Sequence, residues 1–168
     1  MTTLVDATID TVRRISSELR PSVLDDLGLL EAIEWQAQQF QTQTGITYQS
    51  DCSVEDIDLD REQSTAVFRI FQEALTNILR HAEATRFAST LKLEANNLVL
   101  IISDNGKGIT ANEVSRPQSL GLLGMRERAH LVGGEINITG AKGQGTVITV
   151  RVPLVAKRTT SVSAAARS

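Results

Sequence analysis

FRIFQEALTNILRHA, residues 68–82, predicts a helix with two chemically different faces. Glu73, Asn77 and His81 recur every fourth residue, which places a carboxylate, an amide and an imidazole in one row on the helix surface. A second row is apolar and predicts the buried face: Val67, Ile70, Ala74 and Ile78. The polar row could serve a metal, a phosphate chain or a proton transfer, and the row alone does not choose among these.

The sequence before this helix predicts further helices and one strand. Residues 4–19 have the apolar spacing of an amphipathic helix, which Pro21 ends or bends. A second helix is expected over residues 29–43, stopped by Gly45, and ITYQSD (46–51) is typical of a short alternating strand.

The long helix has its own start signal, and the pattern after it changes to that of strands. Asp60 is the expected N-cap, with Gln63 at the third helical position. FASTLKLE (87–94) and NLVLIISD (97–104) predict a hairpin that turns at Asn96-Asn97.

The last part of the chain predicts one helix and a second hairpin. We expect a flexible polar stretch up to Pro117, and then a short helix over residues 122–132 that Gly133-Gly134 closes. EINITG (135–140) and TVITVRVPL (146–154) form the second hairpin around AKGQG. Residues 155–168 are small and polar, and we expect disorder there.

Composition limits the possible classes of protein. The chain has 168 residues and a net charge of −3, which disfavours bulk nucleic-acid binding. The single cysteine, Cys52, excludes an internal disulfide and any multi-cysteine metal site. No apolar run reaches membrane-spanning length and no signal peptide is evident, so we expect a cytoplasmic location, with a parent protein that could be membrane-anchored. Early helices and late hairpins predict an α+β fold in which helices cover one face of the sheet.

Three glycine motifs follow the long helix. Asp104-Asn105-Gly106-Lys107-Gly108 ends an apolar strand and presents a carboxylate that could accept a hydrogen bond from an exocyclic amine such as that of adenine. Gly121-Leu122-Leu123-Gly124 precedes the helical stretch MRERAHLV (125–132), and free backbone N–H groups at such a helix start favour an anion. Gly143-Gln144-Gly145-Thr146 lies in the last hairpin. Each motif alone is equally typical of an ordinary turn or loop.

Taken in order, these motifs resemble the N, G1, G2 and final Gly-Thr boxes of the GHKL ATPase superfamily, which includes histidine kinases, DNA gyrase B, MutL proteins and heat-shock chaperones. QEALTNILRHA, SDNGKGI and SLGLLGMRERAHLVGGEI are similar to the catalytic ATP-binding domain of NarL-partnered (NarX/DesK-like) sensor histidine kinases. The upstream LRPSVLDDLGLL resembles the connector of that subfamily. The resemblance implies the Bergerat fold, a two-layer α/β sandwich with a mixed, mostly antiparallel sheet and an N-terminal helical segment.

The resemblance also assigns roles at the phosphate end of an ATP site. It implies that Asn77 coordinates Mg²⁺ bound to the ATP phosphates. Glu73 would be the catalytic residue that orients the attacking histidine or accepts its proton. His81 would lie near the phosphates, with Arg80 as a helper.

At the other end, the resemblance implies that Asp104 accepts the adenine amino group and that Thr146 supports the base through its hydroxyl. Gly106 and Gly108 would let the base approach the backbone. Met125 would pack against the nucleotide or belong to the core. Three residues would shape the ATP lid: Gly121, Leu122 and Gly124.

The implied activity is transfer of the γ-phosphoryl group of ATP to a histidine on a dimerisation domain. The only histidines, His81 and His130, fall inside the ATPase boxes, so the acceptor is not expected on this chain. Either the acceptor lies on a part of the parent kinase that this chain lacks, which the retained connector favours, or the protein has lost it; in both cases we expect no autophosphorylation in isolation. The implied partners are that dimerisation domain, in a homodimeric parent, and a NarL-type response regulator, with no nucleic acid and no direct membrane contact.

The expected division is a partial dimerisation helix and connector over residues 1–28, the ATP-binding domain over residues 29–154 and a tail over residues 155–168. Two other functions stay open from the sequence. One is an anti-sigma-factor-type serine kinase of the same superfamily, and the other is a non-catalytic nucleotide-binding module.

Overall fold

The structure, a computed structural model, describes residues 21–116 and 119–154. The expected helix over 4–19 and the expected disorder of 155–168 lie outside these residues. The described elements are, in chain order, α2 (Ser22–Leu27), α3 (Leu29–Thr44), β1 (Thr47–Cys52), α4 (Arg61–Asn77), the π-helix η1 (Ile78–Ala82), β2 (Arg86–Glu94), β3 (Asn97–Asp104), α5 (Ala111–Val114), α6 (Leu120–Leu131), β4 (Glu135–Gly140) and β5 (Thr146–Pro153).

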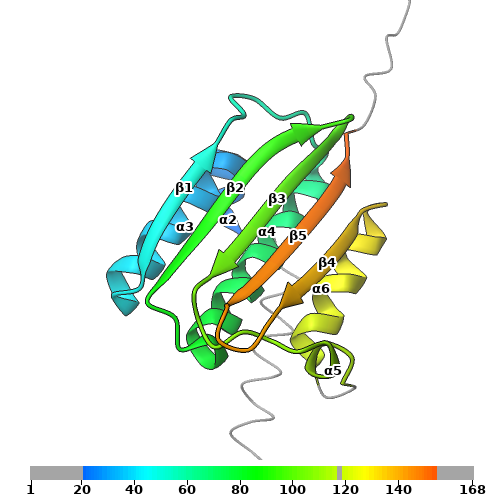
Figure 1. The fold of residues 1–168 in the computed structure, drawn as a ribbon. Helices are drawn as coiled ribbons and strands as arrows, with labels where there is room; N and C mark the ends of the chain where they lie inside the picture. Colours follow the sequence, from blue (N-terminus) through cyan, green and yellow to red (C-terminus); the bar gives the residue numbers. More distant parts are fainter. Residues whose placement is uncertain (1–20, 117–118, 155–168) are drawn as a thin grey trace, which may run out of the picture.

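The strands form one five-stranded sheet in the order β1-β2-β3-β5-β4. The β1–β2 pair is parallel and the other three pairs are antiparallel. Figure 1 shows α3, α4 and α6 together behind the sheet, and none of the described helices lies in front of it. This arrangement confirms the predicted two-layer α+β fold with a mixed, mostly antiparallel sheet.

The predicted central helix forms because its start signal and its apolar stripe agree. Asp60 accepts a hydrogen bond from the backbone N of Gln63 at 2.8 Å, and the Gln63 side chain accepts one from the backbone N of Asp60 at 3.2 Å, so the capping box is complete. The inward face of α4 is fully buried at Val67, Phe68, Ile70, Phe71 and Ala74. Gly45 ends α3 in the left-handed conformation, as its position predicted.

Three local predictions were wrong. The β2–β3 turn is Ala95-Asn96, where φ is positive at both residues, as a two-residue hairpin turn of this kind requires. Asn97 instead opens β3, and its side chain donates to the carbonyls of Glu94 and Ala95. In β1 burial does not alternate, because only Tyr48 of this edge strand is buried.

The polar stretch before Pro117 is the third correction, because it contains the short helix α5. Thr110 and Glu113 form a second capping box at its start: the Thr110 hydroxyl accepts from the backbone N of Glu113, and the Glu113 carboxylate accepts from the backbone N of Thr110. The Thr-x-x-Glu spacing carried this signal in the sequence.

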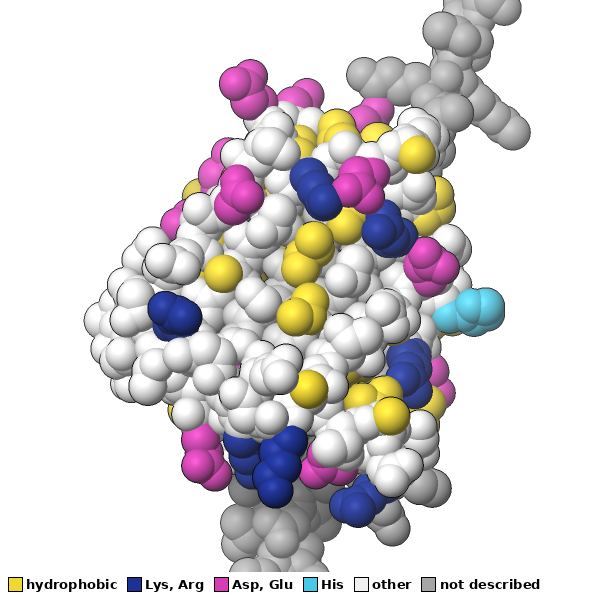
Figure 2. All heavy atoms as spheres, in the orientation of Figure 1, with side chains coloured by type: hydrophobic (Ala, Val, Ile, Leu, Met, Phe, Trp, Pro, Cys, Tyr) yellow, Lys and Arg dark blue, Asp and Glu magenta, His cyan; other side chains and the backbone are white. Residues whose placement is uncertain are grey.

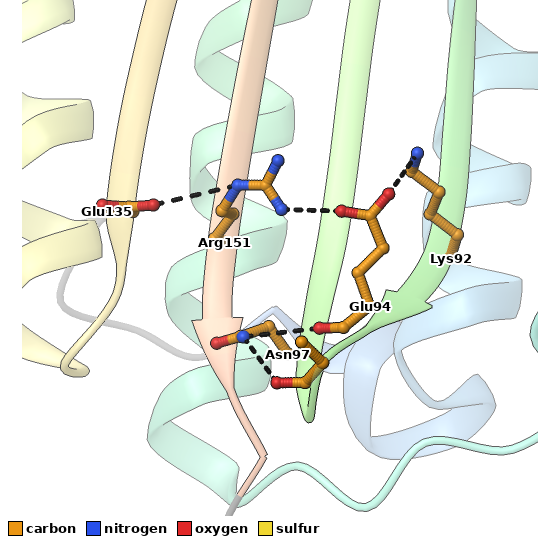
Figure 3. Close-up of polar contacts among 6 residues, drawn as sticks. Lys92, Glu94, Asn97, Glu135 and Arg151 are labelled. Carbon is orange, nitrogen blue, oxygen red and sulfur yellow. Dashed lines mark hydrogen bonds and ion pairs between the residues drawn. The ribbon is translucent and has the colours of Figure 1, made fainter.

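The face of the sheet that the described helices leave uncovered carries a ladder of alternating charges. Figure 2 shows this face, with hydrophobic side chains near its middle and most charged side chains toward the rim. In Figure 3 the guanidinium of Arg151 lies between Glu135 and Glu94, and Glu94 also pairs with Lys92. Val99 stands between Lys92 and Arg151 in the strand register and is fully buried, although it is outside the main core. The long side chains of the ladder therefore cover apolar surface as well as pairing their charges.

Within the described residues, none of the helices has the length and hydropathy of a membrane-spanning segment.

The charge ladder predicts a pH-dependent contribution to stability. The hydrogen bond from Arg151, helped by Lys92, lowers the pKa of Glu94 to about 2. Because the folded pKa lies below the unfolded value, the contribution is complete above the unfolded pKa of about 4.3 and declines as the pH falls toward 2. Urea unfolding of the wild type and of Glu94→Gln should therefore differ more at pH 7 than at pH 3. A difference that does not change with pH would contradict this account.

Candidate nucleotide site

A cavity of about 570 Å³ opens between the C-terminal end of α4, η1, the ends of β3 and β5, and the first turn of α6. Nine of the residues expected at the site line it: Glu73, Asn77, Arg80, His81, Asp104, Gly108, Gly121, Leu122 and Thr146. Three expected residues do not line it: Gly106, Gly124 and Met125. Four sequence motifs that are far apart in the chain thus meet around one cavity, whose size fits a ligand of several hundred daltons.

The polar row continues past the end of the regular α-helix. After Asn77 the chain follows a π-helix, which has a wider turn than an α-helix, so the fourfold spacing no longer stacks side chains directly. Both Arg80 and His81 reach the cavity although they are neighbours in sequence. Each of the two side chains is exposed. The sequence placed the phosphates near Arg80 and His81, and this part of the cavity is open to solvent and carries basic side chains.

The amide of Asn77 is the strongest sign of an unmet interaction. Its Nδ2 atom is buried and has no hydrogen-bond partner among the described residues. A buried unpaired amide costs free energy, on the order of 1–3 kcal/mol, unless a ligand satisfies it. Rotation about the Cβ–Cγ bond exchanges the amide nitrogen and oxygen, so this side chain can meet either a phosphate oxygen or a cation.

The residues fit a cation only if the ligand brings most of its coordination. In the described ranges no group of three or more His, Cys, Asp or Glu side chains is placed to hold a metal ion. Mg²⁺ commonly keeps several waters and binds through phosphate oxygens and one or two protein oxygens. The single amide of Asn77 is compatible with that mode and not with a metal held by protein ligands alone.

Asp104 provides a fixed hydrogen-bond acceptor in the lining of the same cavity. It is the last residue of β3 and is half-buried, and its Oδ1 accepts a hydrogen bond from the backbone N of Gly106 at 2.8 Å. Burial raises the pKa of the Asp104 carboxyl, while the backbone N–H groups of Gly106 and Thr146 act in the other direction. The two N–H groups use part of the hydrogen-bonding capacity of the Asp104 carboxylate and hold it in place. The remaining capacity is available to a ligand in the cavity, which Asp104 lines.

Three glycines around Asp104 are required by close backbone contacts. A Cβ atom at Gly106 would lie 2.1 Å from the carbonyl oxygen of Ala82, and one at Gly145 would lie 1.8 Å from that of Asp104. At Gly108 the Cβ would lie 2.0 Å from the carbonyl oxygen of Ala141. These glycines let the loops pack backbone to backbone. Of Gly106 and Gly108, the two glycines that follow Asp104, Gly108 lines the cavity and Gly106 does not.

The glycines of the lid motif lie inside α6, which corrects the expectation that they precede the helix. Helix α6 begins at Leu120, so Gly121 belongs to its first turn. A Cβ atom at Gly121 would lie 2.2 Å from Oε1 of Glu73 and 3.6 Å from Oδ1 of Asn77. The absence of a side chain at Gly121 therefore lets the start of α6 pack on both polar residues of α4, with its N–H groups and helix dipole beside the carboxylate.

Gly124 and Met125, which do not line the cavity, contact other parts of the protein. Gly124 faces the guanidinium of Arg128, and Met125 is fully buried in the core. Of the two alternatives for Met125, contact with the nucleotide or a place in the core, the geometry favours the core.

Sequence reasoning missed several lining residues. Lys107 and Arg116 add two cations, and Glu113 adds a carboxylate whose pKa is lowered by its hydrogen bonds with Thr110. The remaining walls are apolar, and they suit a planar base: Ile78, Ile102, Ile109, Ile138 and Ile148. Ile102 and Ile148 lie in stretches that the sequence predicted as strands, but no local pattern identified which strand residues border a cavity.

Comparison with known proteins places these features in context. The model of the family described as "Histidine kinase-, DNA gyrase B-, and HSP90-like ATPase" matches residues 62–156. The oxygen sensor histidine kinase NreB of Staphylococcus carnosus is 41% identical over 148 residues, which cover 87% of this chain and 42% of that protein. The chain thus spans less than half the length of this curated relative.

Solved structures match in fold. The blue-light activated histidine kinase of Erythrobacter litoralis EL346 gives a TM-score of 0.70 at 21% identity, over 88% of this chain and 50% of that one. The Acinetobacter baumannii histidine kinase AdeS gives 0.67 at 14% identity, over 92% and 84%.

Two glycines with the same backbone conformation provide a matched test of the loop packing. Gly108 has φ +79° and no room for a Cβ, whereas Gly143 has φ +77° and no atom within 4 Å of one. Gly143→Ala should lower the free energy of unfolding by about 1–2 kcal/mol, the cost of a left-handed alanine. Gly108→Ala should lower it by clearly more, because the Ala141 backbone must also move. Equal losses in urea unfolding would show that the close contact does not matter.

Proposed function

This chain belongs to the histidine kinase-, DNA gyrase B- and HSP90-like ATPase family, and from that premise we propose that it is the ATP-binding catalytic domain of a sensor histidine kinase. The observation that carries the proposal is that one cavity is lined both by Asn77, whose buried amide nitrogen is unpaired, and by the half-buried Asp104. The 41% identity to a sensor histidine kinase supports this choice within the family.

We propose that ATP lies along the cavity with its adenine at the Asp104 end. The Asp104 carboxylate accepts a hydrogen bond from the exocyclic amine, and the Thr146 hydroxyl supports the same edge of the base. The isoleucine walls enclose the ring. The phosphates then extend toward Arg80, His81 and Asn77, and the cations that line the cavity, Arg80, Lys107 and Arg116, offset their charge.

The proposed reaction is phosphoryl transfer to a histidine on a dimerisation domain outside this chain. The bond between the γ-phosphorus and the β,γ-bridging oxygen breaks, and ADP leaves with the electron pair. A bond forms between an imidazole nitrogen and phosphorus, and Glu73 accepts the proton that the imidazole loses. Asn77 would hold Mg²⁺, which would supply charge neutralisation to the phosphates.

We further propose the wider setting from the same relatives. Residues 29–154 form the catalytic domain, and residues 1–28 belong to a dimerisation helix and connector. The parent protein is a dimeric, cytoplasm-facing kinase whose downstream partner is a NarL-type response regulator.

The amide of Asn77 predicts a specific loss of magnesium dependence. Titration calorimetry with a non-hydrolysable ATP analogue should show Mg²⁺-dependent binding by the wild type and little gain from Mg²⁺ in Asn77→Ala. Asn137→Ala, an exposed asparagine of β4, is the matched control and should bind as the wild type does. Equal Mg²⁺ dependence in all three proteins would remove Asn77 from the site, and no binding by the wild type would refute the function.

The Asp104 carboxylate predicts base selectivity. Asp104→Asn keeps the size of the side chain but gives up the charged acceptor, so affinity for ATP should fall about tenfold or more while the weak affinity for GTP changes little. Competition binding with both nucleotides measures this. Parallel losses for ATP and GTP would mean that Asp104 does not contact the base.

The reaction itself is tested by adding a histidine-bearing dimerisation domain with ATP. An acid-labile, alkali-stable phosphoprotein supports a histidine kinase. An acid-stable product on an anti-sigma-factor antagonist would favour the serine kinase alternative, and binding without transfer to either would indicate a nucleotide-binding module.

A further inference from the structure

The proposed site has two ends that come from different chain segments. The base end depends on the loop that follows β3, from Asp104 to Gly108, and the phosphate end depends on η1 at the end of α4. A ligand that spans the cavity contacts both ends at once. Its affinity therefore depends on the distance and angle at which the two segments are joined.

Asn105 joins them without lining the cavity. Its Oδ1 accepts hydrogen bonds from the backbone N atoms of Thr85 and Arg86, each at 3.0 Å, and its Nδ2 donates to the Thr85 hydroxyl at 2.9 Å. Its own backbone N donates to the carbonyl of Arg86 at 3.3 Å. The amide oxygen and the amide nitrogen of this exposed side chain thus both bind the segment that leads from η1 into β2, at Thr85 and Arg86. We call these two residues the corner that follows η1.

The neighbouring residues show that the corner and the loop meet closely. The backbone N of Lys107 donates to the carbonyl of Ala82 at 2.7 Å, and Gly106 leaves no room for a side chain against that same carbonyl. Ala82 is the last residue of η1, next to His81. The backbone contacts bring the segments together. The Asn105 side chain holds Thr85 and Arg86, three and four residues after Ala82 and beyond the last β2–β3 pair at Phe87 and Asp104.

We propose that Asn105 is a positioning residue that holds the base end and the phosphate end of the nucleotide site in register. This inference rests on the proposed ATP-binding function and adds to it a residue that touches no part of the ligand. A positioning role has a distinct signature. It affects a ligand that needs both ends, and it does not affect fragments that need only one.

The experiment compares whole ligand and fragments by NMR titration of the chain. The ligands are a non-hydrolysable ATP analogue, adenosine for the base end, and Mg²⁺-tripolyphosphate for the phosphate end. In Asn105→Ala the affinity for the ATP analogue should fall about tenfold, which is the loss expected from releasing one or two hydrogen bonds of positioning. The affinities for adenosine and tripolyphosphate should stay within about twofold of the wild type, as the same role predicts.

Two variants control for folding and charge. Asn105→Asp keeps the acceptors for Thr85 and Arg86 and lets the Thr85 hydroxyl donate. We define the linkage ratio as the affinity for the ATP analogue divided by the product of the affinities for adenosine and Mg²⁺-tripolyphosphate. In Asn105→Asp this ratio should match the wild type. Any effect of the added charge on phosphate appears equally in tripolyphosphate and cancels in this ratio. Thr85→Val removes one contact only and should lower the ratio less than Asn105→Ala does.

The inference fails if Asn105→Ala weakens adenosine as much as the ATP analogue, which would indicate local collapse of the base end. It also fails if the ratio of the ATP-analogue affinity to the product of the two fragment affinities is the same in Asn105→Ala as in the wild type. The same holds if this ratio falls as much in Asn105→Asp as in Asn105→Ala. Absence of ATP binding by the wild type would instead refute the proposed function.

Discussion

The burial of α4 against the sheet is the interaction on which the rest of the structure depends. Its inward face places Phe68, Ile70 and Phe71 at the centre of the core, each fully buried. Burial of side chains of this size contributes about 1.5–3 kcal/mol each. The same helix carries Glu73 and Asn77 on the side that borders the cavity. The core therefore fixes the position of the polar row, and a shift of this helix would alter the core and the site together.

A second constraint acts where the chain leaves the core. Gly106, Gly108 and Gly145 each bring one backbone segment against the carbonyl of another, at separations that exclude a Cβ atom. These contacts gather the ends of η1, β3 and the last hairpin around Asp104. Their density explains why glycines recur in the motifs: most of them serve loop packing, and Gly121 gives α6 close access to Glu73.

Sequence reasoning predicted the parts of the fold that local physics determines. The capping box at Asp60 and the end of α3 at Gly45 were predicted correctly, and each predicted strand is present, although the alternation of β1 and the exact β2–β3 turn were not. The order of four short motifs indicated the family. The family resemblance also brought together nine of the residues that line the cavity. This worked because each signal depends on a few neighbouring residues or on a strong spacing.

The features that were missed depend on tertiary contacts. The π-helix after Asn77 has no sequence signature, and its wider turn changes where Arg80 and His81 lie. Helix α6 begins before Gly121, although glycine has a low propensity for helix interiors. Close packing of this turn on Glu73 outweighs that local propensity. The hydrogen bond from Asn105 to the Thr85 hydroxyl joins residues that are 20 positions apart, and the sequence alone does not predict it.

The central claim is that the cavity binds ATP with its base at Asp104 and its phosphates at Asn77. A crystal structure of the chain with a non-hydrolysable ATP analogue and Mg²⁺ tests it most directly. The account predicts the exocyclic amine of adenine within hydrogen-bond distance of the Asp104 carboxylate, and Mg²⁺ bridging the phosphates and the Asn77 side chain. A nucleotide bound in the opposite direction, or outside this cavity, would contradict it.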